Sequence, residues 1–302
     1  MSLAFSAERV QALIDILRPE RRTRVLDIGA NPLSPGPYAD LLAAGHCDVW
    51  GFEPQDGPFA ELVAAAGPRE HYIKAAVGDG TEGRLRLCHG SGYSSLLEPD
   101  AATIAAMGRF GRGMRIVDTV PLRTQRLDDI AEVPEFDLLK IDVQGSELAV
   151  FENGRTALGR AVAVITEVAA IPLYKDQPLL DAQMRTLGTM GYHLHRFMFL
   201  KTVKPGGAAL QRLPRRSYAS QLIDADAVFV RGLLAMEGLG DESLKHLAIL
   251  SDAVWGSGDL CVLALAELAR RGSIGEGEID AYVDLLPNAA PRADTVPAQV
   301  AE

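Results

Sequence analysis

VLDIGAN, at residues 25–31, is a short apolar run closed by a glycine. This pattern predicts a buried strand that ends near Ile28. In a doubly wound sheet, ligands bind just beyond the carboxyl ends of the strands. A glycine at that point lets the backbone approach a ligand without interference from a Cβ atom. We therefore expect a ligand site at Gly29 and the residues that follow it.

Strands and helices alternate outward from this stretch, which is typical of parallel βαβ units in a doubly wound α/β sheet. The segment 116–126 is expected to be an edge strand, because Pro121 cannot donate to a ladder. Residues 192–197 and 227–230 are expected to close the sheet. The other strands are expected at residues 24–28, 48–53, 71–77, 84–88, 136–142 and 161–168.

The character of the sequence changes after Gly232, where two amphipathic helices are expected in place of the alternation. We therefore expect a main domain over residues 1–232 and a small C-terminal helical appendage over 233–286. This appendage would cover a sheet edge or form a homodimer surface. The tail, 287–302, is rich in proline and alanine and is expected to be disordered.

Composition restricts the classes of protein to be considered. The 302 residues carry a net charge of -10, which argues against a nucleic-acid partner. We predict no membrane span and no secretory signal, and the three cysteines match no metal spacing, so a cytoplasmic location is expected. Two stretches are nevertheless basic. They are interpreted as solvated faces, with a site for an anionic substrate or its phosphate as the alternative. The stretches are Arg109, Arg112, Arg115, Arg123 and Arg126, and Lys201, Lys204, Arg212, Arg215 and Arg216.

An acidic residue at the end of the second strand indicates a nucleoside site. Glu53 follows the first glycine by about two dozen residues, and its carboxylate could accept bonds from both ribose hydroxyls, with Pro54 fixing the backbone beside it. The pattern G-x-G-x-x-G of dinucleotide sites is missing, which argues against a nicotinamide-dependent oxidoreductase. The site therefore suits a ligand without phosphates, such as S-adenosylmethionine.

Two more carboxylates are expected at the same edge of the sheet. Asp142 ends the strand at 136–142, where alternation places it on the same face as Lys140, and Glu167 ends the next strand. Burial of such groups is costly unless they are paired or used. Asp142 and Glu167 could share a proton, bind a substrate hydroxyl or hold a divalent ion. For Glu147, at the start of the following helix, a structural capping role is the alternative.

At these residues the chain resembles the FkbM-type methyltransferase family. The resemblance spans about residues 22–232 and consists of several motifs in order. They are DIGAN at 27–31, FEP at 52–54, AVGDG at 76–80, SLLEP at 95–99, RLDDI at 126–130, LKIDVQGSELAVFENG at 139–154, TEV at 166–168, YKDQPL at 174–179 and QLIDADAVFVR at 221–231.

The resemblance implies a class I Rossmann-like methyltransferase fold, a mostly parallel sheet with an antiparallel closing strand. It also implies S-adenosylmethionine as cofactor, generally for O-methylation. By carry-over, the methionine part is lined by Asp27, Gly29 and Asn31. Glu53 holds the ribose, Asp79 contacts the adenine, and Asp142 and Gln144 border the transferred methyl. Asn31 stands where many methyltransferases have a second glycine, which indicates that the loop 32–37 is remodelled.

The expected activity is S-adenosylmethionine-dependent methylation of a hydroxyl on a sugar, a natural product or another small-molecule or glycan acceptor. An alcohol has a high pKa, so a base is expected to remove its proton, and Asp142 and Glu167 are the candidates. Tyr93, Ser94 and Ser95 are interpreted as a substrate lip, with a plain surface turn as the alternative. A non-catalytic S-adenosylmethionine-binding or assembly protein that kept the fold is the alternative function.

Overall fold

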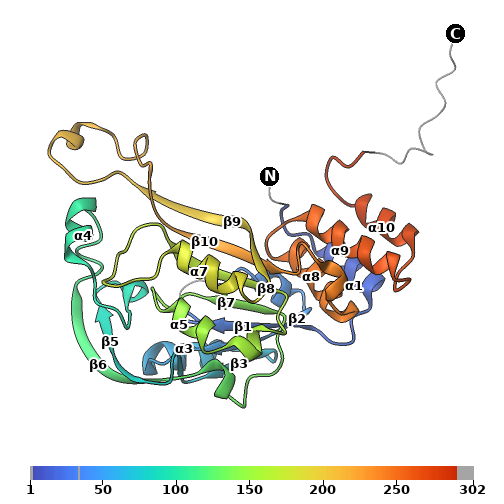
Figure 1. Ribbon diagram of the computed structural model, residues 1–302, viewed down its shortest axis with the longest axis horizontal. Coiled ribbons are helices and arrows are strands. Elements are labelled where there is room, and N and C mark those ends of the chain that lie inside the picture. The colour runs from blue at the N-terminus through green and yellow to red at the C-terminus, as the bar shows by residue number, and fades with distance from the viewer. Residues whose placement is uncertain (1–2, 33–34, 291–302) are drawn as a thin grey trace, which may run out of the picture. The chain divides into compact units, whose positions relative to one another are not determined.

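The structure is a computed structural model that describes residues 3–32 and 35–290 (Figure 1). The chain divides into two compact units. Residues 22–234 form the first, here called the sheet unit. The described parts of 1–21 and 235–302 form the second, here called the helical unit. The domain boundaries expected from the sequence stay a prediction, and most of the tail expected at 287–302 lies outside the described residues.

Seven strands form the main sheet, in the order β3-β2-β1-β7-β8-β10-β9. β10 runs antiparallel to both of its neighbours, and the other pairs are parallel. This arrangement confirms the predicted doubly wound sheet with an antiparallel closing strand. The strands are β1 (Thr23–Ile28), β2 (Cys47–Phe52), β3 (Glu70–Ile73), β7 (Leu138–Ile141), β8 (Ala163–Ala169), β9 (Tyr192–Val203) and β10 (Gln221–Arg231).

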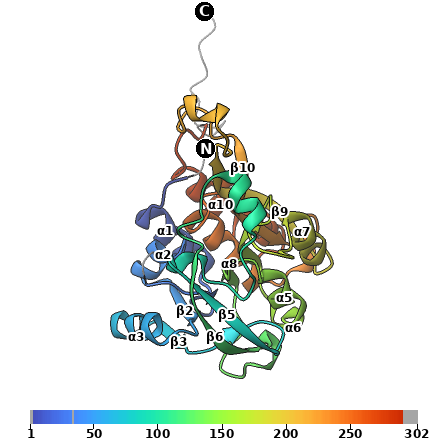
Figure 2. The ribbon, with the colours of Figure 1, turned by 90° about the vertical axis from the view of Figure 1, so that its left-hand side faces the viewer.

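Helices cover both faces of this sheet, as Figure 2 shows. β1, β7 and β8 are almost fully buried, which explains why they read as continuous apolar runs rather than alternating ones. One face carries α2 (Ala39–Ala43) and α3 (Asp56–Ala65), and the other carries α5 (Glu147–Glu152), α6 (Arg155–Leu158) and α7 (Leu180–Gly188).

A second, three-stranded sheet corrects two predictions. The strand expected at 71–77 is split, because β3 ends at Ile73 and β4 (Ala76–Val77) pairs with β6 (Ile116–Gln125) instead. β6 lies in the middle of the order β4-β6-β5 rather than at an edge, with β5 (Glu82–Cys88) on its other side. β4, however, pairs only with the last two residues of β6. Among the described strands, Pro121 therefore has a partner only on the β5 side. On the β4 side no described strand is present to accept a hydrogen bond, so the missing N–H of the proline is tolerated.

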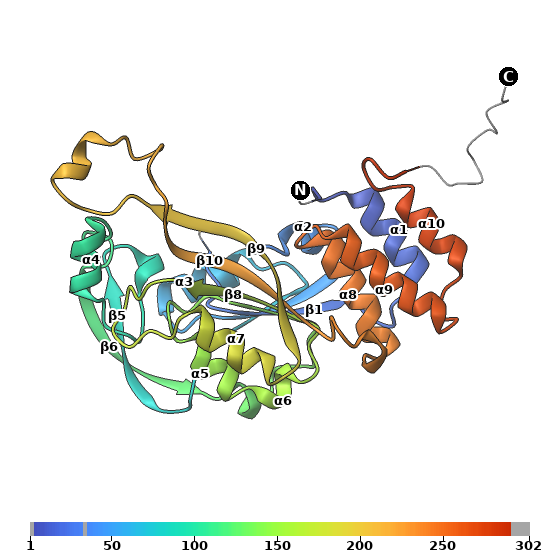
Figure 3. The same cartoon turned by 45° about the horizontal axis from the view of Figure 1, so that its top comes forward.

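The closing strands β9 and β10 are longer than the runs expected at 192–197 and 227–230. Their added parts pair with each other, from Gln221 opposite Val203 to Asp226 opposite Phe199. Val203 and Ile223 are buried there in a small apolar cluster with Phe110 and Met114, which follow α4 (Ala101–Met107). Figures 1 and 3 show this extension and α4 at the same end of the sheet unit.

The helical unit consists of α1 (Ala7–Leu17), α8 (Asp241–Ala253), α9 (Gly258–Arg270) and α10 (Glu276–Val283). Ser6 caps α1 by accepting a hydrogen bond from the amide of Arg9, as its residue type favours. Inside the unit, the buried carboxylate of Asp252 pairs with Arg9 and accepts a hydrogen bond of 2.7 Å from the hydroxyl of Tyr282. These contacts tie α1 to helices at the other end of the chain. No helix in the described part of the chain is long and apolar enough to span a membrane.

Candidate functional site

The register of the main sheet brings the candidate residues to one level. Ile28 of β1 lies opposite Phe52 of β2 and Ile141 of β7, and Ile141 lies opposite Thr166 of β8. The residues that directly follow Ile28, Phe52, Ile141 and Thr166 therefore lie side by side toward the carboxyl edge of the four strands. These residues are Gly29, Glu53, Asp142 and Glu167.

A cavity of about 650 Å³ opens at this edge. Its size lies within the range of about 300–1,000 Å³ that is typical of small-molecule sites. The loops after β1, β2 and β7 line it, together with residues 165–167 of β8, residues 91, 92 and 94–96, and Met198 of β9. Of the predicted site residues, the lining contains Asp27, Gly29, Asn31, Glu53, Pro54, Ser94, Ser95, Asp142, Gln144 and Glu167.

Gly29 is required by a close approach of two loops. Its φ is +83°, a region that residues with a Cβ rarely adopt. A Cβ at this position would lie 2.0 Å from the carbonyl oxygen of Asp142. The amide of Asp142 also donates to the carbonyl of Ile28, at 3.0 Å. The floor of the cavity is therefore a tight junction between the ends of β1 and β7.

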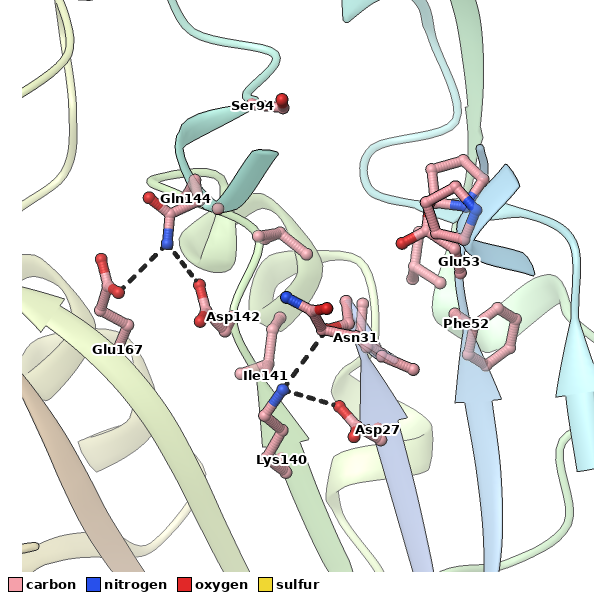
Figure 4. Close-up of a pocket in the computed structure, with 18 of the residues that line it drawn as sticks. Asp27, Asn31, Phe52, Glu53, Ser94, Lys140, Ile141, Asp142, Gln144 and Glu167 are labelled. Atoms are coloured by element: carbon pink, nitrogen blue, oxygen red, sulfur yellow. Dashed lines mark hydrogen bonds and ion pairs between the residues drawn. The ribbon is translucent and has the colours of Figure 1, made fainter. Parts of the chain in front are cut away.

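Asp27 supports this junction from below (Figure 4). One carboxylate oxygen accepts a hydrogen bond of 2.6 Å from the hydroxyl of Tyr38, and the other lies 2.9 Å from Nζ of Lys140. Burial acts to lower the pKa of Lys140, but the charges of Asp27 and then Asp142 raise it above its usual value. Lys140 therefore stays a cation and neutralises Asp27. Both oxygens of Asp27 are engaged within the protein, although the residue borders the cavity.

Glu53 presents a buried carboxylate to the cavity. One oxygen accepts a hydrogen bond of 2.7 Å from the amide of Gln55. The other oxygen has no hydrogen-bond partner among the described residues. Burial raises the pKa of Glu53, and the bond from Gln55 opposes this shift. Because Glu53 lines the cavity, this oxygen is open to a ligand that brings hydroxyl donors to this point.

Asp142 and Glu167 are joined by one side-chain amide, as Figure 4 shows. Nε2 of Gln144 donates to Asp142 at 2.7 Å and to Glu167 at 3.2 Å. Oε1 of Gln144 lies 3.0 Å from the hydroxyl of Tyr174, and its backbone carbonyl accepts a bond of 2.7 Å from Ser95. Gln144 has φ of +56°, an unfavourable region for a residue with a Cβ. Strain of this kind persists only where the surroundings fix it, as these bonds do.

The two carboxylates differ in their environment. Burial and then the charge of Asp142 raise the pKa of Glu167 well above its usual range. Asp224 and Glu147 act in the same direction, whereas Lys201 opposes them. Two carboxylates at this separation repel one another when both are ionised, and this repulsion favours the protonated form of Glu167. The arrangement offers one carboxylate as a proton acceptor and one protonated carboxyl as a donor.

Asp79 and Tyr93 lie outside the cavity lining, unlike the other predicted site residues. The carboxylate of Asp79 accepts bonds from Thr81 and Thr124, which close a turn and lower its pKa. The ring of Tyr93 packs edge-on against Phe110, with centroids 6.2 Å apart.

Ser94 and Ser95 line the cavity, but their hydroxyls have partners within the protein. Oγ of Ser94 accepts a bond from the amide of Cys88, and the buried Ser95 accepts one from Leu97 while it donates to Gln144. The segment therefore fixes Gln144 as well as bordering the site. The described residues contain no group of three or more His, Cys, Asp or Glu side chains able to hold a metal ion.

Sequence reasoning assigned no role to three residues that support the site: Tyr38, Tyr174 and Lys140. Tyr38 and Tyr174 reach it from loops, and only the motif that begins at Tyr174 carried a signal. For Lys140, the alternation with Asp142 was a signal, but nothing in the sequence indicated that its partner is Asp27, 113 positions earlier. The two residues meet because β1 and β7 pair side by side, with Asp27 opposite Lys140.

The family model described as "Methyltransferase FkbM domain" matches residues 27–194. No curated protein matches the chain. Three similar solved structures are the magnesium protoporphyrin IX methyltransferase of Synechocystis PCC 6803 with bound SAM, the TYW2 protein of M. jannaschii in complex with AdoMet, and a segment described as StiE O-MT.

The sequence identities to this chain are 12%, 11% and 12%, and the TM-scores are 0.35, 0.32 and 0.35, in the same order. The matches cover 74%, 74% and 80% of this chain, and 79%, 74% and 77% of the other chains. These similarities are too distant to bear on the acceptor.

Proposed function

Because the chain belongs to the FkbM methyltransferase family, whose model matches more than half of it, we propose that it methylates a hydroxyl group of a sugar or natural-product acceptor. Its cofactor is S-adenosylmethionine. The observation that supports the hydroxyl acceptor is the pair Asp142 and Glu167, held together by Gln144 at the cavity edge.

The cavity fits this cofactor. The oxygen of Glu53 that lacks a partner is suited to the ribose hydroxyls, and Gly29 leaves room where a Cβ would intrude. Asn31 would border the methionine part, whereas Asp27 would act by fixing the loop rather than by direct contact. When bound, S-adenosylmethionine supplies an electrophilic methyl group attached to a sulfonium.

The carboxylate pair supplies the acid–base function that a hydroxyl acceptor needs. An alcohol must lose its proton as the new bond to carbon forms. Asp142 would accept that proton, while protonated Glu167 would donate a hydrogen bond and help orient the acceptor. The raised pKa of Glu167 supports the role of donor for this member of the pair. Gln144 keeps both groups in position throughout.

The test uses S-adenosylmethionine labelled with ¹³C at its methyl group and a panel of glycosides and hydroxylated natural products. We expect an O-methyl product, which NMR distinguishes from N-methyl and C-methyl products by chemical shift. Asp142→Asn should lower turnover by about 10²-fold or more, the usual scale for loss of a general base. Calorimetry should show that this variant still binds the cofactor.

Each other outcome has a defined meaning. A methyl group on nitrogen or carbon would exclude the O-methyl assignment. Full activity of Asp142→Asn would exclude Asp142 as the base. Tight cofactor binding without transfer to any acceptor of the panel would favour the non-catalytic alternative.

A further inference from the structure

Two segments of the sheet unit carry cations but no acids. Residues 101–117 contain three arginines and no Asp or Glu, and residues 192–223 also lack acidic residues. In a chain of net charge -10, this is a marked segregation of charge. Six exposed arginines belong to these segments: Arg109, Arg112, Arg115, Arg212, Arg215 and Arg216.

The structure brings the two segments together. The amide of Gly206 donates to the carbonyl of Ala106 at 2.9 Å, and a Cβ on Gly108 would lie 2.8 Å from Cα of Gly206. Figures 1 and 3 show α4 and the loop between β9 and β10 at the same end of the sheet unit. The arginines of both segments therefore belong to one end of the unit.

None of these six arginines forms an ion pair with another described residue. Exposed arginines elsewhere commonly do, such as Arg160 with Glu135 and Arg185 with Asp181. Like charges gathered without counterions repel one another, and their field attracts an anionic partner.

The same segments also expose large apolar side chains. Ile116 and Val117 follow Arg115 directly, Phe199 and Leu200 lie on β9, and Tyr218 follows Arg216 in the loop. Phe199 is 55% exposed, which is high for a phenylalanine in a strand. A soluble phosphate compound would be bound by the arginines alone and would leave this apolar surface in water. Basic residues mixed with exposed apolar ones instead match the charge and the interfacial depth of an anionic bilayer.

We propose that this basic–apolar end of the sheet unit, formed by the six arginines and these five apolar residues, docks on an anionic lipid surface. The cavity lies next to it. Met198, which lines the cavity, directly precedes Phe199. The amide of His89, two residues before the cavity-lining Ser91, donates to the carbonyl of Arg115 at 2.9 Å. On the proposed function, which this step assumes, the acceptor would be a lipid-linked compound with a free hydroxyl.

The experiment is co-sedimentation of the full chain with vesicles, without cofactor or acceptor, so that its result is independent of the methyl transfer. Vesicles of phosphatidylcholine are compared with an equal mixture of phosphatidylcholine and phosphatidylglycerol. We expect binding only to the mixture, with loss at about 1 M salt, where the Debye length falls to about 3 Å.

Two variants test the two components of the surface. Arg215→Glu with Arg216→Glu should weaken vesicle binding by about 25-fold or more, since each basic residue near such a surface contributes about fivefold. Phe199→Ser with Leu200→Ser should weaken it without a change in charge. The matched control is Arg155→Glu with Arg185→Glu, exposed arginines on α6 and α7 that change the net charge equally. Unchanged S-adenosylmethionine affinity shows that each variant is folded.

Equal binding to both kinds of vesicle, or binding to neither, would overturn the proposal. So would a control variant that binds as weakly as the double reversal at Arg215 and Arg216. If inorganic pyrophosphate binds in a way that depends on these arginines while vesicles do not, the surface serves a soluble phosphorylated compound instead. Binding of an acidic protein in place of vesicles would equally exclude a lipid surface.

Discussion

Gly29→Ala is the substitution for which the structure gives the clearest magnitude. The new Cβ would lie 2.0 Å from the carbonyl oxygen of Asp142, whereas real Cβ contacts essentially never fall under 3.0 Å. The ends of β1 and β7 would have to separate by about 1 Å or more. The positive φ adds about 1–2 kcal/mol, and overpacking a tight junction adds about 1–3 kcal/mol. We expect the free energy of unfolding to fall by about 2–5 kcal/mol.

Two other glycines of the sheet unit separate these contributions. Gly191 has nearly the same φ, +84°, but its Cβ would meet only Arg231 at an ordinary 3.8 Å. Gly191→Ala should therefore cost only the backbone part, about 1–2 kcal/mol. Gly57, in the first turn of α3, has nothing within 4 Å, and alanine there should be neutral or stabilising by up to about 1 kcal/mol.

The assays are urea unfolding and calorimetric titration with S-adenosylmethionine. Because the shifted junction forms the cavity floor, Gly29→Ala should weaken cofactor binding by about tenfold or more, about 1.4 kcal/mol. Gly191→Ala and Gly57→Ala should bind as the wild type does. If Gly29→Ala unfolds like Gly191→Ala and keeps its cofactor affinity, the junction is not the constraint inferred from the geometry.

Three further predictions concern side chains around the cavity. Glu53→Ala should weaken S-adenosylmethionine binding in calorimetry by about tenfold or more, because hydrogen bonds to a charged group contribute about 1.5–3 kcal/mol; unchanged affinity would exclude Glu53 as the ribose ligand. Tyr174→Phe removes a hydroxyl that lies 3.0 Å from both Oε1 of Gln144 and the carbonyl oxygen of Tyr93, so urea unfolding should show a loss of about 1–3 kcal/mol while cofactor affinity is kept, and a selective loss of affinity would contradict this. Burial raises the pKa of Glu147 to about 7, so its contribution to stability is present below about pH 4.5 and is lost as the pH rises toward 7. Both backbone amides that bond to Glu147 reach the same oxygen, so glutamine can keep these bonds. Above pH 7, Glu147→Gln should be more stable than wild type by about 3 kcal/mol, and a difference that does not vary with pH would contradict the shift.

The strand ends were the part of the site that the sequence could predict. Gly29, Glu53, Asp142 and Glu167 each follow an apolar run, and neighbouring parallel strands align such positions at one edge of a sheet. Pairing in register then places the residues together without any knowledge of the loops.

The partners of these residues could not be predicted in the same way. The sequence alone gave no reason for Tyr38 to reach Asp27 or for Tyr174 to reach Gln144, since both tyrosines come from loops whose paths depend on tertiary packing. The break in the predicted strand after Ile73 also depends on tertiary packing. The run continues to Val77 in the sequence, but Ala76 and Val77 find their partner in β6, about 50 residues further along the chain. Local pattern does not determine which of two sheets a strand joins.

The positions of the two lysines determine which carboxylates remain available for chemistry. Lys140 lies 2.9 Å from Asp27, and Lys201 lies 2.7 Å from Asp224, so both of these acids are neutralised within the fold. Asp142, Glu167 and Asp226 line the cavity and form no ion pair with a described residue. Burial and the neighbouring carboxylates raise the pKa of Asp226 as well as that of Glu167. A cationic ligand in this cavity would stabilise the ionised forms of these carboxyl groups, and the sulfonium of the cofactor is such a cation. The same carboxyl groups disfavour an anionic group deep in the cavity, because none of them is paired with a cation among the described residues. We therefore expect any phosphate of the acceptor to stay outside, toward the arginines, while its hydroxyl reaches Asp142.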